Sequence, residues 1–183
     1  EESRLITSAR DLAIYTLALH TGIRISELVS LDVKDINWNN RSFKVIRKRG
    51  NEDIVYFDNT TERVLLDWLD ERKDMKETLG IADDEPALFI STKGRNRGTR
   101  LSVRSVERMV KKYAEIAVPE VKGMHVHSLR STCATNVYEK SHDLVYTKSL
   151  LGHSSVNTTM RYVKDDEQKK KDNRTLLDRK KDG

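Results

Sequence analysis

The apolar residues of this chain recur at helical spacing almost throughout, and this pattern constrains the fold more than any other feature of the sequence. Near the start, Ser8 is suited to cap a helix that begins near Ala9, and Thr21-Gly22 ends the apolar stripe. Further helices are predicted from residue 23 to 31, from 60 to 76, from 101 to 117, from 128 past 138, from 143 to 151 and from 157 to 166. These segments predict a mainly helical protein.

One region, residues 35–57, has the pattern of β-structure instead. Residues 41–46 alternate between polar and apolar side chains, and the apolar run 54–57 follows a turn at Gly50-Asn51. Thr60 or Thr61 is then placed to cap the next helix, in which Trp68 is expected to lie in the core. Together the patterns predict an α+β fold that is mainly α, with a small antiparallel sheet.

Composition limits the chain to a single domain, with at most a small appendage, under a strongly charged surface. It has 183 residues, a net charge of +5 and a pI of about 9.2, which favours a polyanionic partner. The single Cys133 excludes an internal disulfide framework and fits a reducing compartment. No apolar run approaches the length of a membrane span and no secretory signal opens the chain, so we expect a cytoplasmic protein without a membrane partner. Because the chain begins without a methionine, we also expect it to be an excised fragment.

A segment near the C-terminus holds four polar side chains at informative spacings. His127 and Arg130 are three residues apart, a spacing that places two side chains on one face when both lie on a helix. A leucine pair followed by Gly152 is typical of a helix end with the glycine in the left-handed conformation, and His153 comes next. Tyr162 follows nine residues later. From the residues alone, His153 could be a turn residue and Tyr162 an ordinary half-buried phenol.

A zinc site is the metal alternative for this segment. His125, His127 and Cys133 lie close together in the sequence. A structural zinc site needs four ligands at characteristic spacing, and the fourth is missing. We therefore expect no metal ion and no other cofactor.

Arg24 is the other arginine whose position attracts attention. It lies between two isoleucines near the start of a predicted helix, a place that suits anion binding. Glu27 follows three residues later, and on spacing alone an ordinary surface ion pair between the two is the simpler explanation.

Five motifs in a fixed order resemble the catalytic domain of the tyrosine recombinases, also called phage-type integrases. They are H-T-G-I-R-I-S-E-L at residues 20–28, the basic hairpin R-K-R-G-N-E-D-I-V-Y-F at 47–57, H-S-L-R at 127–130, L-G-H-S-S at 151–155 and R-Y at 161–162. The resemblance covers roughly residues 5–164. It implies a helical catalytic domain of the DNA breaking-rejoining type over residues 1–166 and a charged tail over residues 167–183 that can dock on a neighbouring subunit.

The resemblance also implies a role for each side chain that matches the recombinase motifs. Arg24 and Arg130 would clamp the scissile phosphate, since a planar guanidinium matches phosphate oxygens, and Glu27 would support the site. Tyr162 would be the nucleophile that forms a 3′-phosphotyrosine. The remaining roles are proton transfer at the tyrosine by His127, donation to a phosphate oxygen by His153 and protonation of the 5′ oxygen by Lys48.

The position of the catalytic lysine depends on how the hairpin is aligned. An ungapped match places it at Lys48, whereas a shift of one residue would put Arg49 there instead. This hairpin departs from the recombinase pattern, because Arg47 and Arg49 stand where those proteins usually have glycine.

The stretch from residue 93 to residue 104 is basic: it has two glycines, and none of its residues is acidic. It can be a solvated connection, but in a DNA-binding protein it is the best candidate for phosphate contacts. The candidate DNA-binding residues are Lys93, Arg95, Arg97, Arg100 and Arg104.

The resemblance implies site-specific DNA recombination or integration, performed by metal-independent strand cleavage and rejoining in a bacterial, DNA-associated protein. Its partner would be double-stranded DNA, bound by a homotetramer on two duplexes. Two alternatives share parts of the sequence pattern: a type IB-like topoisomerase, and a non-enzymatic basic DNA-binding protein in which the Tyr162 constellation is a coincidence.

Overall fold

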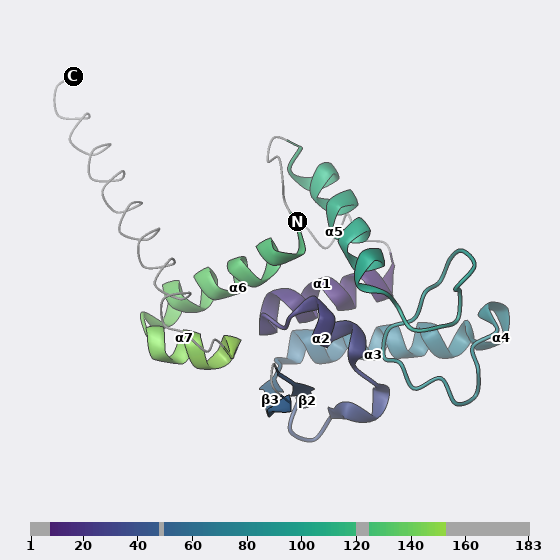
Figure 1. Ribbon diagram of the computed structural model, residues 1–183, viewed down its shortest axis with the longest axis horizontal. Helices are drawn as coiled ribbons and strands as arrows, with labels where there is room; N and C mark the ends of the chain where they lie inside the picture. The colour runs from purple at the N-terminus through teal and green to yellow at the C-terminus, as the bar shows by residue number, and fades with distance from the viewer. Residues whose placement is uncertain (1–7, 48–49, 120–124, 153–183) are drawn as a thin grey trace. The chain divides into compact units, whose positions relative to one another are not determined.

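The computed structural model describes residues 8–47, 50–119 and 125–152. Figure 1 shows the elements along the chain, which divides into two compact units, residues 1–133 and 134–183. In order, the elements are α1 (Ala9–Thr21), α2 (Ile25–Ser30), a 3-10 turn (Val33–Asp35), β1 (Ile36–Asn37), β2 (Ser42–Ile46), β3 (Glu52–Tyr56), α3 (Asn59–Asp74), α4 (Lys76–Leu79), α5 (Val103–Ala117), α6 (Val126–Ser141) and α7 (Leu144–Leu151). The predicted mainly helical α+β fold with a small antiparallel sheet is confirmed.

The first helix begins and ends where the sequence predicted. The Ser8 hydroxyl accepts a hydrogen bond from the Asp11 amide, so Ser8 is the N-cap of α1. Gly22 ends the helix in the left-handed conformation, with φ of 60°, and its amide donates to the Ala18 carbonyl. The chain therefore turns sharply at Gly22 and enters α2 three residues later.

The sheet has three antiparallel strands in the order β1-β2-β3. Phe43 on β2 pairs with Val55 on β3, and both side chains are buried on the inner face together with Val45. On the outer face, Ile54 and Tyr56 remain exposed. The predicted hairpin is thus confirmed, and its alternation places one face on the core and one in solvent.

The third helix begins earlier than the sequence indicated. We expected Thr60 or Thr61 as its cap, but Asp58 is the N-cap, and its carboxylate accepts the Thr61 amide over 2.8 Å. Aspartate caps a helix as well as threonine does, and Asp58 also contacts His20 Nδ1 on α1 at 2.8 Å. The contact with α1 lies far away in sequence, so the local pattern did not reveal it.

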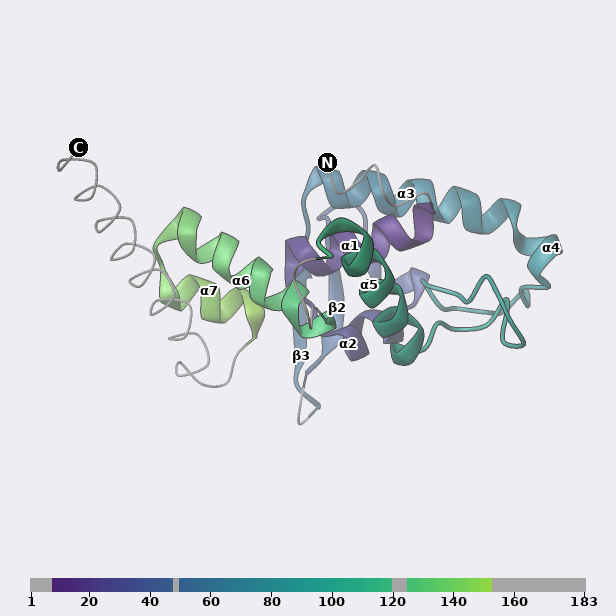
Figure 2. The same cartoon turned by 90° about the horizontal axis from the view of Figure 1, so that it is seen from above.

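The core of the first unit lies between its helices and the inner face of the sheet. α3 packs along α1, as Figures 1 and 2 both show, and α2 contacts α5. Trp68 on α3 is fully buried, stacks on Phe89 and donates a hydrogen bond from Nε1 to the Leu88 carbonyl over 2.8 Å. The expectation that Trp68 belongs to the core is confirmed.

In the second unit, the described residues are the end of α6 and the whole of α7. Asp143 caps α7 by accepting hydrogen bonds from the amides of Val145 and Tyr146. Gly152 ends α7 in the left-handed conformation with φ of 59°, as the sequence predicted. The predicted helix at residues 157–166 and the tail at 167–183 lie outside the described residues. Among the residues that are described, no helix is long and apolar enough to cross a membrane.

Candidate active site

The segment from Gly22 to Glu27 is the centre of the candidate site. Thr21 shapes it, because its hydroxyl donates to the Leu17 carbonyl over 2.6 Å and accepts from the Ile23 amide. Arg24 then precedes the first residue of α2, where its backbone amide donates to Glu27 Oε2 over 3.1 Å. The Gly22 turn and this hydrogen bond fix where the Arg24 side chain leaves the backbone.

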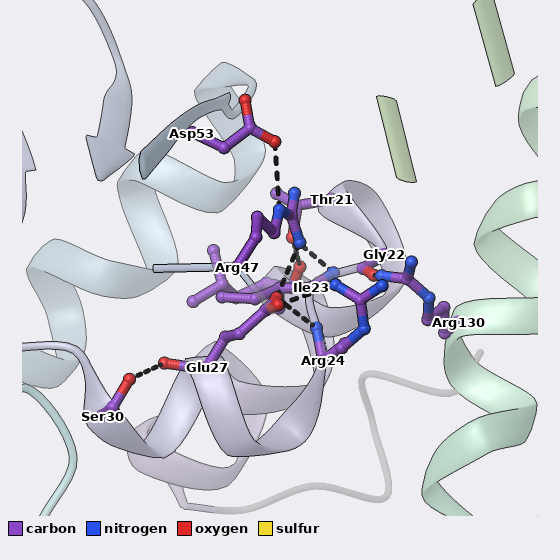
Figure 3. Close-up of polar contacts among 10 residues, drawn as sticks. Thr21, Gly22, Ile23, Arg24, Glu27, Ser30, Arg47, Asp53 and Arg130 are labelled. Carbon is purple, nitrogen blue, oxygen red and sulfur yellow. Dashed lines mark hydrogen bonds and ion pairs between the residues drawn. The ribbon is translucent and has the colours of Figure 1, made fainter. Parts of the chain in front are cut away.

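Glu27 is a buried carboxylate that contacts two arginines. Its side chain is 8% exposed, and Oε1 accepts from Arg24 Nη1 over 2.8 Å. Oε2 accepts from Arg47 Nη1 over 2.7 Å (Figure 3). The Arg24–Glu27 ion pair that spacing suggested therefore exists, but it lies in a largely buried network and not on an open surface.

Arg47 is a residue of this network that the sequence analysis did not propose as a site residue. Its side chain is only 10% exposed, and its Nε donates to Asp53 Oδ2 on β3 over 3.0 Å. One signal in the sequence could have found it: Arg47 continues the alternation of Phe43 and Val45, which points toward the inner face of the sheet.

Arg130 reaches the same segment from α6. Its Nη1 donates to the carbonyl of Gly22, which lies 108 residues away in the sequence (Figure 3). Val126 and Leu129 are buried and hold this end of α6 against the core of the first unit. The structure thus brings Arg24 and Arg130, the two arginines that the motifs singled out, to one short stretch of backbone.

The other residues named from the motifs are only partly covered by the structure. His127 lies in the first turn of α6 and is exposed, three residues before Arg130. Lys48, its alternative Arg49, His153 and Tyr162 lie outside the described residues.

Three of the five candidate DNA-binding residues lie together in one exposed turn of the basic loop. Lys93, Arg95 and Arg97 are exposed in a turn that an isolated bridge between Ile90 and Arg100 closes. Within this turn Gly98 has φ of 81° and lies so close to α4 that an added Cβ would stand 2.8 Å from the Leu79 carbonyl oxygen. The backbone of the loop therefore approaches α4 closely at Gly98, while its three cations are exposed to solvent.

Arg100 and Arg104 differ from each other in what they contact. Arg100 donates to the carbonyls of Val29 and Leu31 and to Asp32 Oδ1, over 3.0, 3.1 and 2.5 Å. Arg100 thus joins the loop to the end of α2, while Arg104 is exposed in the first turn of α5. A phosphate contact by Arg100 would compete with these internal hydrogen bonds.

Cys133 is buried on α6, and this bears on the zinc alternative. Burial raises the pKa of its thiol to about 11, although the nearby Arg130 acts in the opposite direction. Within residues 8–47, 50–119 and 125–152, no three His, Cys, Asp or Glu side chains gather as a metal site would require.

We expect the native Cys133 thiol to react with a disulfide reagent such as DTNB about 100-fold more slowly at pH 8 than it does in the denatured chain, because burial suppresses the thiolate. The release of the coloured thiol, followed with and without urea, measures this ratio. Equal rates in the native and denatured states would contradict the prediction that Cys133 is a buried, protonated thiol. Stoichiometric zinc binding that Cys133→Ser removes would contradict it as well.

Comparisons with known proteins agree on one family. Residues 3–169 match the model described as the phage integrase family. The XerC tyrosine recombinase of Corynebacterium glutamicum is 37% identical over 84% of this chain and 46% of its own length. The XerS tyrosine recombinase of Streptococcus agalactiae is 38% identical over 87% of this chain and 44% of its own length. The chain thus spans about half the length of the curated relatives it matches.

Two solved structures have the same fold. A XerH site-specific recombinase bound to a palindromic difH substrate, in a post-cleavage complex, has a TM-score of 0.76 and 25% identity, covering 97% of this chain and 49% of its own. The XerA recombinase has a TM-score of 0.73 and 30% identity, covering 88% of this chain and 57% of its own.

Proposed function

The chain belongs to the phage integrase family, and from this we propose that it carries out site-specific DNA recombination through a covalent bond between a 3′ phosphate and Tyr162. The observation that carries the proposal furthest is the convergence of Arg24 and Arg130 on the Gly22–Glu27 segment. Two guanidinium groups held at one segment are suited to grip the oxygens of one phosphate.

The chemistry requires these cations. Attack by a phenol oxygen on phosphorus gathers negative charge on the non-bridging oxygens, and fixed donors stabilise that charge in the transition state. Arg24 and Arg130 are the proposed donors, and Glu27 holds Arg24 in orientation. A water-poor setting strengthens this effect, and the side chains of Glu27 and Arg47 are about nine-tenths buried.

In the proposed cleavage step, the phosphoryl group passes from the 5′ oxygen of the DNA to Tyr162. The Tyr162 oxygen forms a bond to phosphorus while the bond from phosphorus to the 5′ oxygen breaks. His127 assists the departure of the phenol proton, Lys48 protonates the 5′ oxygen, and His153 donates to a non-bridging oxygen. The phosphotyrosyl ester conserves the energy of the broken bond, so a 5′ hydroxyl of another strand can reverse the reaction without ATP.

Double-stranded DNA is the proposed partner. The XerH relative was solved on its DNA substrate, and Lys93, Arg95 and Arg97 of this chain form an exposed basic turn. Cations of this kind bind phosphates without reading sequence, so their contribution should weaken as salt rises. We further propose that the active assembly is a homotetramer on two duplexes and that the segment 167–183 docks on a neighbouring subunit.

Covalent trapping tests the proposed function. A DNA site is first selected from a random duplex library by its binding to the protein, and a nested set of duplexes is then made with a nick at each successive position. We expect one nick position to trap a protein–DNA adduct on a denaturing gel, with EDTA present, on the 3′ side of the break. Peptide mapping of the adduct should identify the Tyr162 peptide.

The outcomes separate the recombinase from its alternatives. An adduct at a defined site, followed by joining to a second duplex, supports recombination. Relaxation of supercoils without a defined site would favour the topoisomerase. If the protein binds the selected DNA but forms no adduct at any nick, the proposal of catalysis fails and the non-enzymatic alternative stands.

A further inference from the structure

Arg47 is a buried cation with two acidic partners and no role in the chemistry described above. It follows the last residue of β2, and its side chain is 10% exposed. Nη1 contacts Glu27 at 2.7 Å and Nε contacts Asp53 at 3.0 Å, so the guanidinium bridges α2 and β3 (Figure 3). A large, charged side chain occupies such a place only when its partners compensate the loss of water.

The charges of this network bear directly on Arg24. Glu27 accepts from both Arg24 and Arg47, so its single negative charge is shared between two guanidinium groups. Without Arg47, Glu27 would pair with Arg24 alone and cancel much of the attraction that Arg24 can offer an anion. Asp53 lies on the far side of Arg47 and is 40% exposed, so solvent screens its charge more strongly than that of Glu27.

The contacts also fix the geometry of Glu27. Arg47 and the Arg24 amide both donate to Oε2, which leaves Oε1 directed at Arg24 Nη1. Arg47 is itself anchored through its backbone, because its amide donates to the Asn51 carbonyl over 2.7 Å across the hairpin loop. Arg47 therefore links the strands of the hairpin to the carboxylate that orients Arg24.

We propose that Arg47 is a positioning residue for phosphate recognition: it acts through Glu27 on the orientation and effective charge of Arg24, and it does not touch the substrate. This inference rests on the proposed function and extends it to a residue on the hairpin that the recombinase pattern does not single out. It predicts that loss of Arg47 weakens the response of the site to charge on the scissile phosphate.

The test compares two linkages at the same cleavage site. One duplex carries the ordinary phosphodiester, and the other a methylphosphonate, in which a methyl group replaces one non-bridging oxygen and removes the negative charge. We expect Arg47→Met to slow single-turnover cleavage of the phosphodiester by roughly 10- to 100-fold, since small errors of orientation cost this much. Cleavage of the methylphosphonate should fall by no more than about threefold, because a neutral linkage depends less on the cations.

Two further variants sharpen the comparison. Arg47→Lys keeps the charge but not the fork that reaches both acids, so it should recover part of the phosphodiester rate. Arg41→Met is the matched control: Arg41 precedes the other end of β2, pairs with Glu62 at 2.9 Å and is 48% exposed, and its loss should leave both rates unchanged. If Arg47→Met does not fold, Arg47→Lys carries the same comparison with a smaller expected loss on the phosphodiester.

Each outcome decides between distinct explanations. Equal losses on both linkages would mean that Arg47 only supports the fold, and the proposal would be overturned. Recovery of Arg47→Met on a 5′-phosphorothiolate, whose sulfur departs without a proton, would place the defect at the leaving group and overturn it as well. If the wild-type protein forms no tyrosyl adduct, the proposed function itself fails. If the wild type forms the adduct but Arg47→Met cleaves the two linkages in the same ratio as the wild type, only the role proposed for Arg47 is overturned.

Discussion

Replacing Tyr162 by phenylalanine is expected to abolish the covalent protein–DNA adduct and to leave DNA binding unchanged. Phenylalanine lacks the oxygen that would form the ester, so no slower version of the same step remains. The ring and its volume are kept, so the contacts that bind DNA should persist. Denaturing gels of the nicked duplexes measure adduct formation, and gel mobility shifts on the same duplexes measure binding.

A second tyrosine provides the control. Tyr146 lies on α7 and is 53% exposed, so Tyr146→Phe removes a phenol oxygen without disturbing the core. This variant should give the wild-type yield of adduct. An adduct that survives Tyr162→Phe would show that another residue is the nucleophile, and the role assigned to Tyr162 would have to be abandoned.

Replacing Arg130 by alanine is expected to slow cleavage by roughly 100- to 1000-fold, the scale of losing one donor to the charge of a transition state. The structural reason is that Arg130 reaches the Gly22 carbonyl beside Arg24, so its loss removes one side of the proposed phosphate clamp. The buried Gly22 carbonyl also loses a hydrogen bond, which should lower the free energy of unfolding by only about 1–2 kcal/mol. Single-turnover cleavage rates and thermal unfolding separate these two effects.

Arg63 supplies the comparison for net charge. It is exposed on α3, so Arg63→Ala removes one positive charge from the molecule without touching the candidate site. Cleavage by Arg63→Ala should stay within about threefold of wild type, because surface charges are screened. If Arg130→Ala cleaves as fast as Arg63→Ala at saturating DNA, Arg130 is not a phosphate ligand.

Local signals in the sequence predicted most of the fold. Ser8 and Gly22 bound α1, Gly152 ends α7, and the alternation of residues 41–46 became β2. These predictions succeeded because capping, left-handed turns and strand alternation depend on residues within a few positions of one another. The predicted threonine cap of α3 was wrong although capping is local, because Asp58, a residue type that caps helices as well as threonine does, accepts the Thr61 amide three residues later.

For the basic loop, too, the sequence predicted some features and the structure was needed for others. Its exposed cations were evident from composition, whereas the internal contacts of Arg100 with Val29, Leu31 and Asp32 were not. A run of basic residues identifies a charged surface, but it does not tell which member folds back onto the protein. Only the packing of the loop against the end of α2 separates Arg100 from Lys93, Arg95 and Arg97.

The sequence by itself determined the order of the motifs, the residue types available for chemistry and the mainly helical fold, because each of these is written in neighbouring residues. The tertiary structure decided that Arg130 contacts Gly22 and that Glu27 lies buried between Arg24 and Arg47. It also decided that the hairpin contacts α2 through Arg47 and Glu27. Contacts of this kind join residues far apart in the chain. These contacts form only when hydrophobic burial brings α2, α6 and the sheet together. The spacing of neighbouring residues carries no information about a partner that lies far away in the sequence.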